Sequence, residues 1–223
     1  PIDEVLRESE QLVRAGVKEL LVISQDTSAY GSDLKYAKRT WRGADRETRF
    51  LDLARGLGEL CAWVRLHYVY PYPHVDDVIP LMADGKILPY LDIPFQHALP
   101  SVLKLMRRPA NQVKTLDRIK AWRAMAPDLA IRSNFIVGYP GETEADHDEL
   151  LAFVEEARLD WCGFFSYSEE AGTYAAGLTD RIDEALVDDR LAELRELQDE
   201  ITQERRDELV GREVEVLVDE RGV

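Results

Sequence analysis

Polar residues directly follow five apolar runs of the sequence, and their side chains are able to hydrogen bond a ligand. These groups are Ser24–Thr27, Pro71–His74, Pro94–His97, Gly138–Glu142 and Ser166–Glu169. In parallel β/α proteins ligands bind at the carboxyl ends of the strands, so the five groups are expected to converge on one rim. The chemistry predicted for that rim is hydrogen bonding to a polar ligand.

The run Gly138–Thr143 (GYPGET) has features of a ligand-binding turn. Its two glycines permit a tight turn that leaves peptide N–H groups free, and Glu142 stands where a helix opens. Thr143 and Asp146 have the spacing of a capping box. A strand-to-helix turn with a good cap explains the same residues without a ligand, so both interpretations stay open.

No arrangement of side chains in the sequence predicts a nucleophile or a metal site. His97 is able to donate to a ligand hydroxyl, although a loop histidine with an ordinary hydrogen bond is the commoner case. The sequence has no Ser-His-Asp order, no H-x-x-x-H spacing and no phosphate-binding loop of the Walker type. Cys61 and Cys162 form no C-x-x-C or C-x-x-x-C pair, and we expect both to be buried structural thiols. We therefore predict no catalytic residue and no metal ligand.

Strand and helix patterns alternate through most of the chain. Apolar runs of strand length occur at 18–24, 63–70, 88–93, 130–137 and 161–167. Helical periodicity occurs at 3–15, 46–61, 75–84, 111–125 and 144–157. The turn-rich stretch 25–44 is predicted to be a long polar loop. Such alternation implies parallel strands joined by right-handed crossovers.

An α/β fold follows, and two architectures stay open: a doubly wound sheet and an open β/α barrel. Five strands are too few for a closed eight-stranded barrel, but a partial barrel whose first strand lies before Pro1 fits.

The last forty residues change in character. A long charged helix is predicted at 183–209, and residues 212–220 alternate in strand period. The helix is expected to pack through Val187, Leu191, Leu194 and Ile201. We therefore predict a core at 1–182, a linker helix at 183–210 and the start of a truncated β domain at 211–223.

Charge and hydropathy narrow the class of protein. The net charge is −15, with 43 acidic and 28 basic residues, which argues against a generic nucleic-acid binder because such proteins need clustered Lys and Arg. With 45% hydrophobic residues the chain is able to bury the core of one domain. No apolar run is long enough to cross a bilayer and no signal-peptide pattern opens the sequence, so we expect a cytoplasmic protein without a membrane partner.

Four segments together resemble the radical S-adenosylmethionine methylthiotransferase family. They are ISQDTSAYG at 23–31, LDIPFQHALPSVLKLMRRP at 91–109, FIVGYPGETEAD at 135–146 and FSYSEEAGTYA at 165–175. The long helix followed by VGREVEVLVDE at 210–220 resembles the junction with the TRAM domain of that family. The segments occur in the family's order and span the whole chain.

Within the family, QDTSAYG and YSEEAGT look like the RimO branch, which thiomethylates an aspartate of a small-subunit ribosomal protein at the decoding centre. The tRNA-modifying MiaB branch typically has an Asn-rich sequence at the first of these places and a basic run at the second. The acidic balance of this chain suits a basic ribosomal protein better than RNA. The electron donor is not identified by the resemblance.

The resemblance implies an open barrel that binds S-adenosylmethionine at its rim, and it implies roles for individual residues. Gln25, Asp26 and Thr27 correspond to contacts with the methionyl end of the cofactor, and Gln96 and His97 to contacts near the ribose. The adenine and the cofactor backbone are expected to meet the turn and the last strand. Those residues are Val137, Gly138, Gly141, Glu142, Phe165, Ser166 and Tyr167.

The chain departs from the family in its cysteines. Radical SAM enzymes hold a [4Fe–4S] cluster with a C-x-x-x-C-x-x-C motif, which is absent from these 223 residues. In relatives the motif precedes a stretch like that beginning at Pro1, and a second cluster lies earlier still. We therefore expect the chain to be the central part of a longer enzyme, inactive alone, whose intact form carries both [4Fe–4S] clusters.

Two further interpretations stay open. A MiaB-like enzyme would carry out the same chemistry on tRNA and would bind it with strong salt dependence. A relative without clusters would bind a ligand or partner and catalyse nothing.

Overall fold

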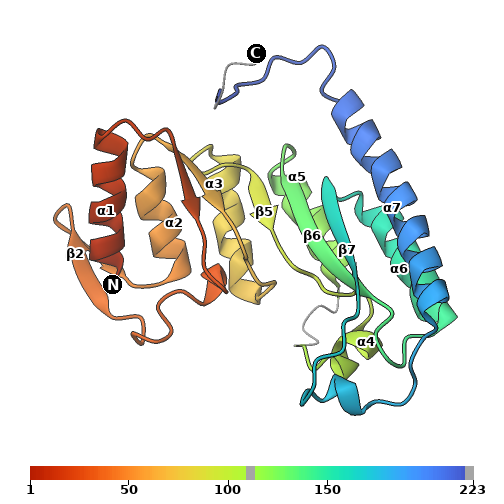
Figure 1. Ribbon diagram of the computed structural model, residues 1–223. Coiled ribbons are helices and arrows are strands. Elements are labelled where there is room, and N and C mark those ends of the chain that lie inside the picture. The colour runs from red at the N-terminus through yellow and green to blue at the C-terminus, as the bar shows by residue number, and fades with distance from the viewer. Residues whose placement is uncertain (109–113, 219–223) are drawn as a thin grey trace.

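Five parallel strands form one sheet in the order β1-β4-β5-β6-β7 (Figure 1). The computed structural model describes residues 1–108 and 114–218. The sheet strands are β1 (Glu19–Val22), β4 (Trp63–Leu66), β5 (Tyr90–Asp92), β6 (Ala130–Val137) and β7 (Trp161–Ser166). The helices are α1 (Ile2–Arg14), α2 (Phe50–Gly58), α3 (Ile79–Ala83), α4 (Pro100–Leu105), α5 (Thr115–Met125), α6 (Glu144–Ala157) and α7 (Glu184–Asp207). Short 3-10 turns cover Thr27–Ala29, Pro73–Val78 and Ala175–Gly177.

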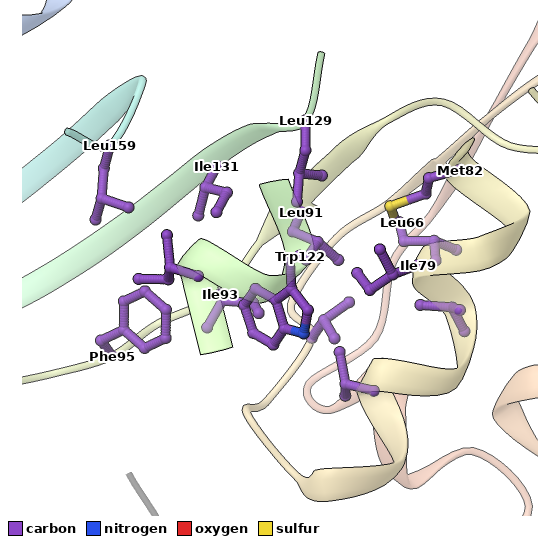
Figure 2. Packing of buried hydrophobic residues seen from close by; sticks show 14 of the residues in the cluster. Leu66, Ile79, Met82, Leu91, Ile93, Phe95, Trp122, Leu129, Ile131 and Leu159 are labelled. Atoms are coloured by element: carbon purple, nitrogen blue, oxygen red, sulfur yellow. The ribbon is translucent and has the colours of Figure 1, made fainter. Parts of the chain in front are cut away.

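The two faces of the sheet differ in burial, and β6 shows the difference most clearly. Its residues alternate strictly between buried and half-buried, because successive side chains of a strand point to opposite faces. The buried side chains pack under the helices, where Ile131, Leu91 and Trp122 belong to one cluster (Figure 2). The opposite face is open, with Leu21 and Phe165 exposed. Helices on one face only are what an open barrel requires.

Helix α6 begins where the sequence predicts. The Thr143 side chain accepts a hydrogen bond from the Asp146 backbone N–H, and the Asp146 carboxylate accepts one from the Thr143 backbone N–H at 2.8 Å. These reciprocal bonds satisfy two N–H groups that lack partners within the helix. The predicted capping box is therefore confirmed.

Helix α7 packs against α6 and β7. The four apolar residues expected on its packed side, Val187, Leu191, Leu194 and Ile201, are all buried. Arg190 and Gln198 are also buried on this side, and both hydrogen bond to residues of the core. The helix is thus part of the same folded body as the sheet.

The predicted long loop at 25–44 is wrong in its second half. An antiparallel hairpin joins β2 (Lys38–Trp41) to β3 (Ala44–Glu47). Arg42 and Gly43 both have positive φ, 51° and 78°, as a two-residue hairpin turn requires. Trp41 is buried beside the Arg42 and Arg46 guanidiniums. The sequence does not predict this hairpin, because its basic strands lack an alternation of apolar and polar residues.

Two other expectations fail. Residues 212–218 form no strand, and residues 219–220 of that predicted strand lie outside the described part of the chain. A single strand needs a neighbour for its backbone hydrogen bonds, and the described residues provide none there. Cys61 is exposed rather than buried, because α2 ends at Gly58 and Cys61 follows with a φ of 55°. Residues 111–113 of the helix predicted at 111–125 also lie outside the described residues.

Candidate functional site

A cavity of about 710 Å³ lies at the carboxyl ends of β6 and β7. Pockets that bind small organic ligands have volumes of roughly 300–1,000 Å³. Four residues predicted for the site line this cavity, and two side chains of β6 join them. The lining includes Gln96, Phe165, Ser166, Tyr167, Asn134 and Ile136.

The apolar wall of the cavity comes from the pairing of the two strands. The register places Ile136 beside Phe165 on the open face, while Phe135 and Phe164 point into the core. Phe165 is 57% exposed, unusual for so large an apolar side chain. Its ring offers a flat apolar surface against which an aromatic ligand group is able to stack.

Two polar atoms at the cavity lack partners. Asn134 Oδ1 and Tyr167 Oη are buried and make no hydrogen bond to any residue in the described ranges. Both residues line the cavity. Because an unpaired buried polar group is costly, binding that moves a covering side chain and brings these atoms a hydrogen-bond partner would be favoured.

Gln96 is held at the cavity by its own backbone. It has a φ of 70°, which for a residue with a side chain costs about 1 kcal/mol or more. Its N–H donates to the Asn134 carbonyl at 2.9 Å, and its carbonyl accepts from the Ile136 N–H at 2.8 Å. These two bonds extend the sheet beyond β5 and fix the side chain at the cavity wall.

His97 and Glu142 lie elsewhere, in a buried cluster that joins the Gly138–Glu142 turn to α7. Glu142 Oε2 accepts from the Gly138 N–H at 3.0 Å, and Glu142 Oε1 accepts from Arg190 Nη1 at 2.8 Å. His97 Nε2 is 3.7 Å from Glu142 Oε2, and neither side chain has exposed surface. His97 Nδ1 accepts from the Leu99 N–H.

Burial controls the protonation of this cluster. It lowers the pKa of His97 to about 4, so the imidazole is neutral at pH 7. Burial also raises the pKa of Glu142 above its ordinary value, although the Arg190 guanidinium acts in the opposite direction. The cluster therefore has the character of an internal structural element.

The structure thus brings together only part of the predicted site. Val137 is fully buried, and the Gly141 N–H donates to the Asp180 carbonyl. Neither residue lines the large cavity, and nor do His97, Gly138 or Glu142. Gly138 lines a smaller cavity of about 260 Å³ together with Ser166 and Tyr167.

Gln25, Asp26 and Thr27, in the loop that follows β1, belong to a compact turn. Asp26 Oδ1 accepts from the Ala29 N–H at 3.1 Å and so caps the following 3-10 turn. Thr27 is buried, and its hydroxyl donates to the His67 carbonyl at 2.6 Å. Gln25 is exposed. These residues lie at the β1 end of the sheet and do not line the large cavity.

A family model decides which fold family this geometry represents. The model described as the Radical SAM superfamily matches residues 1–154. The chain belongs to the Radical SAM superfamily. The open sheet with helices on one face and a cavity at the strand ends agrees with that membership.

Two similar relatives share one name. The chain is 59% identical over 222 residues to the ribosomal protein uS12 methylthiotransferase RimO of Bradyrhizobium sp. strain BTAi1, covering 100% of this chain and 50% of the relative. It is 61% identical over 220 residues to the protein of that name from Thiobacillus denitrificans, covering 99% and 50%. This Radical SAM chain therefore spans about half the length of the curated relatives it matches.

One solved structure shows the same fold. It is coproporphyrinogen III oxidase (HemN) from Escherichia coli, described as a Radical SAM enzyme, with a TM-score of 0.55 and 17% sequence identity. The match covers 90% of this chain and 46% of that one. The likeness supports the open-barrel architecture predicted from the alternation of strands and helices.

The described residues of this Radical SAM chain do not fit an iron–sulfur cluster. They contain no group of three His, Cys, Asp or Glu that could hold a metal ion. Cys61 is exposed beyond the end of α2. Cys162, also expected to be buried, is half-buried in β7, where desolvation raises the pKa of its thiol. No helix in the described ranges is long and apolar enough to span a membrane.

Sequence reasoning missed part of the cavity wall. Asn134 and Ile136 lie on it, and their alternation with buried neighbours in β6 was the available signal. Arg107 and Tyr174 also line the cavity, with the guanidinium 3.8 Å from the centre of the ring. The contact joins the turn after α4 to the loop after β7, a pairing that no local pattern reveals.

Proposed function

We propose that this chain is the cofactor-binding core of a methylthiotransferase that modifies the β-carbon of an aspartate in the ribosomal protein uS12. The observation that carries the proposal is the identity of 59–61% to relatives named uS12 methylthiotransferase, extending over the whole chain. Superfamily membership supports S-adenosylmethionine as the cofactor. We further propose that the enzyme acts in the cytoplasm on this small-subunit protein, at the decoding centre.

The cavity residues fit S-adenosylmethionine. Phe165 offers an exposed ring for the adenine. The unpaired Asn134 Oδ1 is able to accept a hydrogen bond, and the unpaired Tyr167 Oη is able to accept or donate one. When bound, the cofactor would supply radical chemistry. The protein residues would orient it and exclude water, with Gln96 fixed at the wall by its backbone bonds.

The predicted contacts at His97 and Glu142 take a different part in this proposal. Both side chains are enclosed in the turn cluster, so we propose that they act by holding the turn against α7. Gln25–Thr27 remain proposed contacts for the methionyl end, and the backbone of Gly138 and Gly141 remains a proposed contact for the adenine and the cofactor backbone.

The test uses protein expressed from the complete reading frame, purified without oxygen and supplied with iron, sulfide, reductant and S-adenosylmethionine. With uS12 as substrate, we expect one methylthio group on a single aspartate, detected by mass spectrometry of the digested protein. Bulk tRNA serves as the alternative substrate and should stay unmodified. Modification of tRNA in place of uS12 would support the MiaB-like alternative, and a reading frame without C-x-x-x-C-x-x-C would contradict catalysis.

A further inference from the structure

The open face of the sheet carries a network of charged and aromatic side chains outside the cavity. Its members lie on β1, β4, β5 and β6, except for His67, which directly follows β4. They are Glu19, Arg65, His67, Tyr90, Asp92 and Arg132. The side chain of Asp92 is only 3% exposed and accepts bonds from two of the others. Taking these charged groups out of water costs free energy, so we expect a function for the members that remain exposed.

Arg65 is satisfied within the network. Its Nε donates to Glu19 Oε1 at 2.7 Å, and its guanidinium lies 4.8 Å from the centre of the Tyr90 ring. A carboxylate on one side and an aromatic face on another are the usual partners of an arginine. Arg65 therefore has the contacts expected of a structural residue.

Arg132 is satisfied only in part. Its Nη1 donates to Asp92 Oδ1 at 3.0 Å, which is the single hydrogen bond of this guanidinium within residues 1–108 and 114–218. The side chain is 38% exposed on the open face. A guanidinium has five N–H donors in a planar fork, so a second carboxylate is able to bind beside Asp92.

The position of Arg132 relates it to the cavity. Arg132, Asn134 and Ile136 occupy alternate positions of β6 and share its open face. Asn134 and Ile136 line the cavity, and neighbouring positions on one face of a strand are about 7 Å apart. Arg132 thus lies on the same open face of the sheet as the cavity wall, one step away from it toward the amino end of β6.

We propose that Arg132 is the specificity-determining residue that binds the carboxylate of the target aspartate, with Asp92 holding the guanidinium in place. The inference rests on the proposed function and names the residue that selects its substrate. An aspartate whose β-carbon reacts carries its carboxylate on the next atom, so the charge enters the barrel with the reacting carbon. A buried carboxylate needs a cation, and the amide of asparagine does not.

The test compares two uS12 substrates that carry Asp or Asn at the modified position. Enzyme from the complete reading frame is assayed for methylthiolation and for cofactor cleavage without substrate. The wild type should prefer Asp over Asn by at least about tenfold in kcat/KM, because a charge-assisted bond is lost with Asn. Arg132→Met should reduce this preference to less than about threefold and leave cleavage without substrate within about twofold.

Two further variants keep the test decisive. Arg65→Met removes a cation from the same face and should leave the Asp preference at its wild-type value. If Arg132→Met fails to fold, Asp92→Asn combined with Arg132→Met removes both charges and leaves no unpaired carboxylate.

The outcomes separate the two proposals. If Arg132→Met leaves the preference for Asp unchanged, the inference is overturned and the proposed function stands. The same holds if the variant binds S-adenosylmethionine more weakly while the preference stays intact, because Arg132 would then bind the carboxylate of the cofactor. A wild-type enzyme that leaves uS12 unmodified overturns the proposed function, and the inference with it.

Discussion

Strand β6 has an arginine–carboxylate pair near each end, and the two pairs differ in their access to solvent. Beyond its carboxyl end, Arg190 and Glu142 have side-chain exposures of 4% and 0%. Near its amino end, Arg132 and Asp92 have exposures of 38% and 3%. The enclosed pair fastens a turn to α7, whereas the open pair leaves donors free. The same chemistry thus serves the fold at one end and is available to a ligand at the other.

The largest expected effect comes from breaking the enclosed pair. Arg190→Met leaves the Glu142 carboxylate buried without its cation, and we expect a loss of about 3–5 kcal/mol in the free energy of unfolding. Urea denaturation of the 223-residue chain measures this loss. Arg206→Met, on the exposed side of α7, is the matched control and should change stability by less than about 0.5 kcal/mol. Equal losses in the two variants would show that Arg190 does not anchor the turn.

The enclosed cluster should also make stability depend on pH. Burial lowers the pKa of His97 from 6.5 to about 4, so between these values the unfolded chain binds a proton that the folded chain does not. Stability should therefore fall by up to about 3 kcal/mol as the pH drops from 6.5 to 4. Relative to the wild type, His97→Asn should remove this part of the pH dependence in urea denaturation. If the stability of the two proteins changes with pH in the same way, His97 is not the source of this pH dependence.

The closeness of the turn to α7 predicts a third effect. A Cβ at Gly138 would lie 2.5 Å from Val187 Cγ2, and this glycine has a φ of 78°. Gly172 has a similar φ of 83° but open space around it, so Gly172→Ala measures the backbone cost alone. We expect Gly138→Ala to destabilise the chain by about 1–3 kcal/mol more than Gly172→Ala. Thermal or urea unfolding measures the difference. An equal loss of stability in the two variants would mean that α7 moves away from the added methyl group without a loss of stability.

The smallest expected effect concerns the open face. Phe165→Ala should weaken S-adenosylmethionine binding by about tenfold, since stacking on an aromatic ring contributes about 1–3 kcal/mol. Equilibrium dialysis with protein from the complete reading frame measures the affinity. Trp161→Ala changes an exposed aromatic of the same strand outside the cavity and should leave the affinity unchanged. Equal affinity in all three proteins would remove Phe165 from the site.

The sequence allowed some elements of this fold to be predicted to the residue. The predicted bounds of β6 and α6, 130–137 and 144–157, agree with the structure, because strand alternation and the Thr143 cap act locally. The packed side of α7 was predicted for the same reason. The β2–β3 hairpin was missed because the residues around Trp41 are polar, and no pattern in them predicts that Trp41 is buried.

The site was less predictable than the fold. Phe165, Ser166 and Tyr167 reach the cavity because strand ends meet at one rim. His97 stands only one residue after Gln96, yet it is enclosed by Glu142 and by a turn more than forty residues away. Which of two adjacent polar residues faces a cavity depends on tertiary packing, and a motif in one dimension does not record it.

The most direct measurement is a crystal structure of the protein from the complete reading frame with S-adenosylmethionine bound. We predict the adenine ring against Phe165 in the 710 Å³ cavity, with hydrogen bonds from the cofactor to residues of β6 and to Gln96. The Arg132 guanidinium should stay beside Asp92, open to substrate. A cofactor bound away from this cavity, or one in contact with His97 and Glu142 after the turn cluster has opened, would contradict the assignment of the open face as the site.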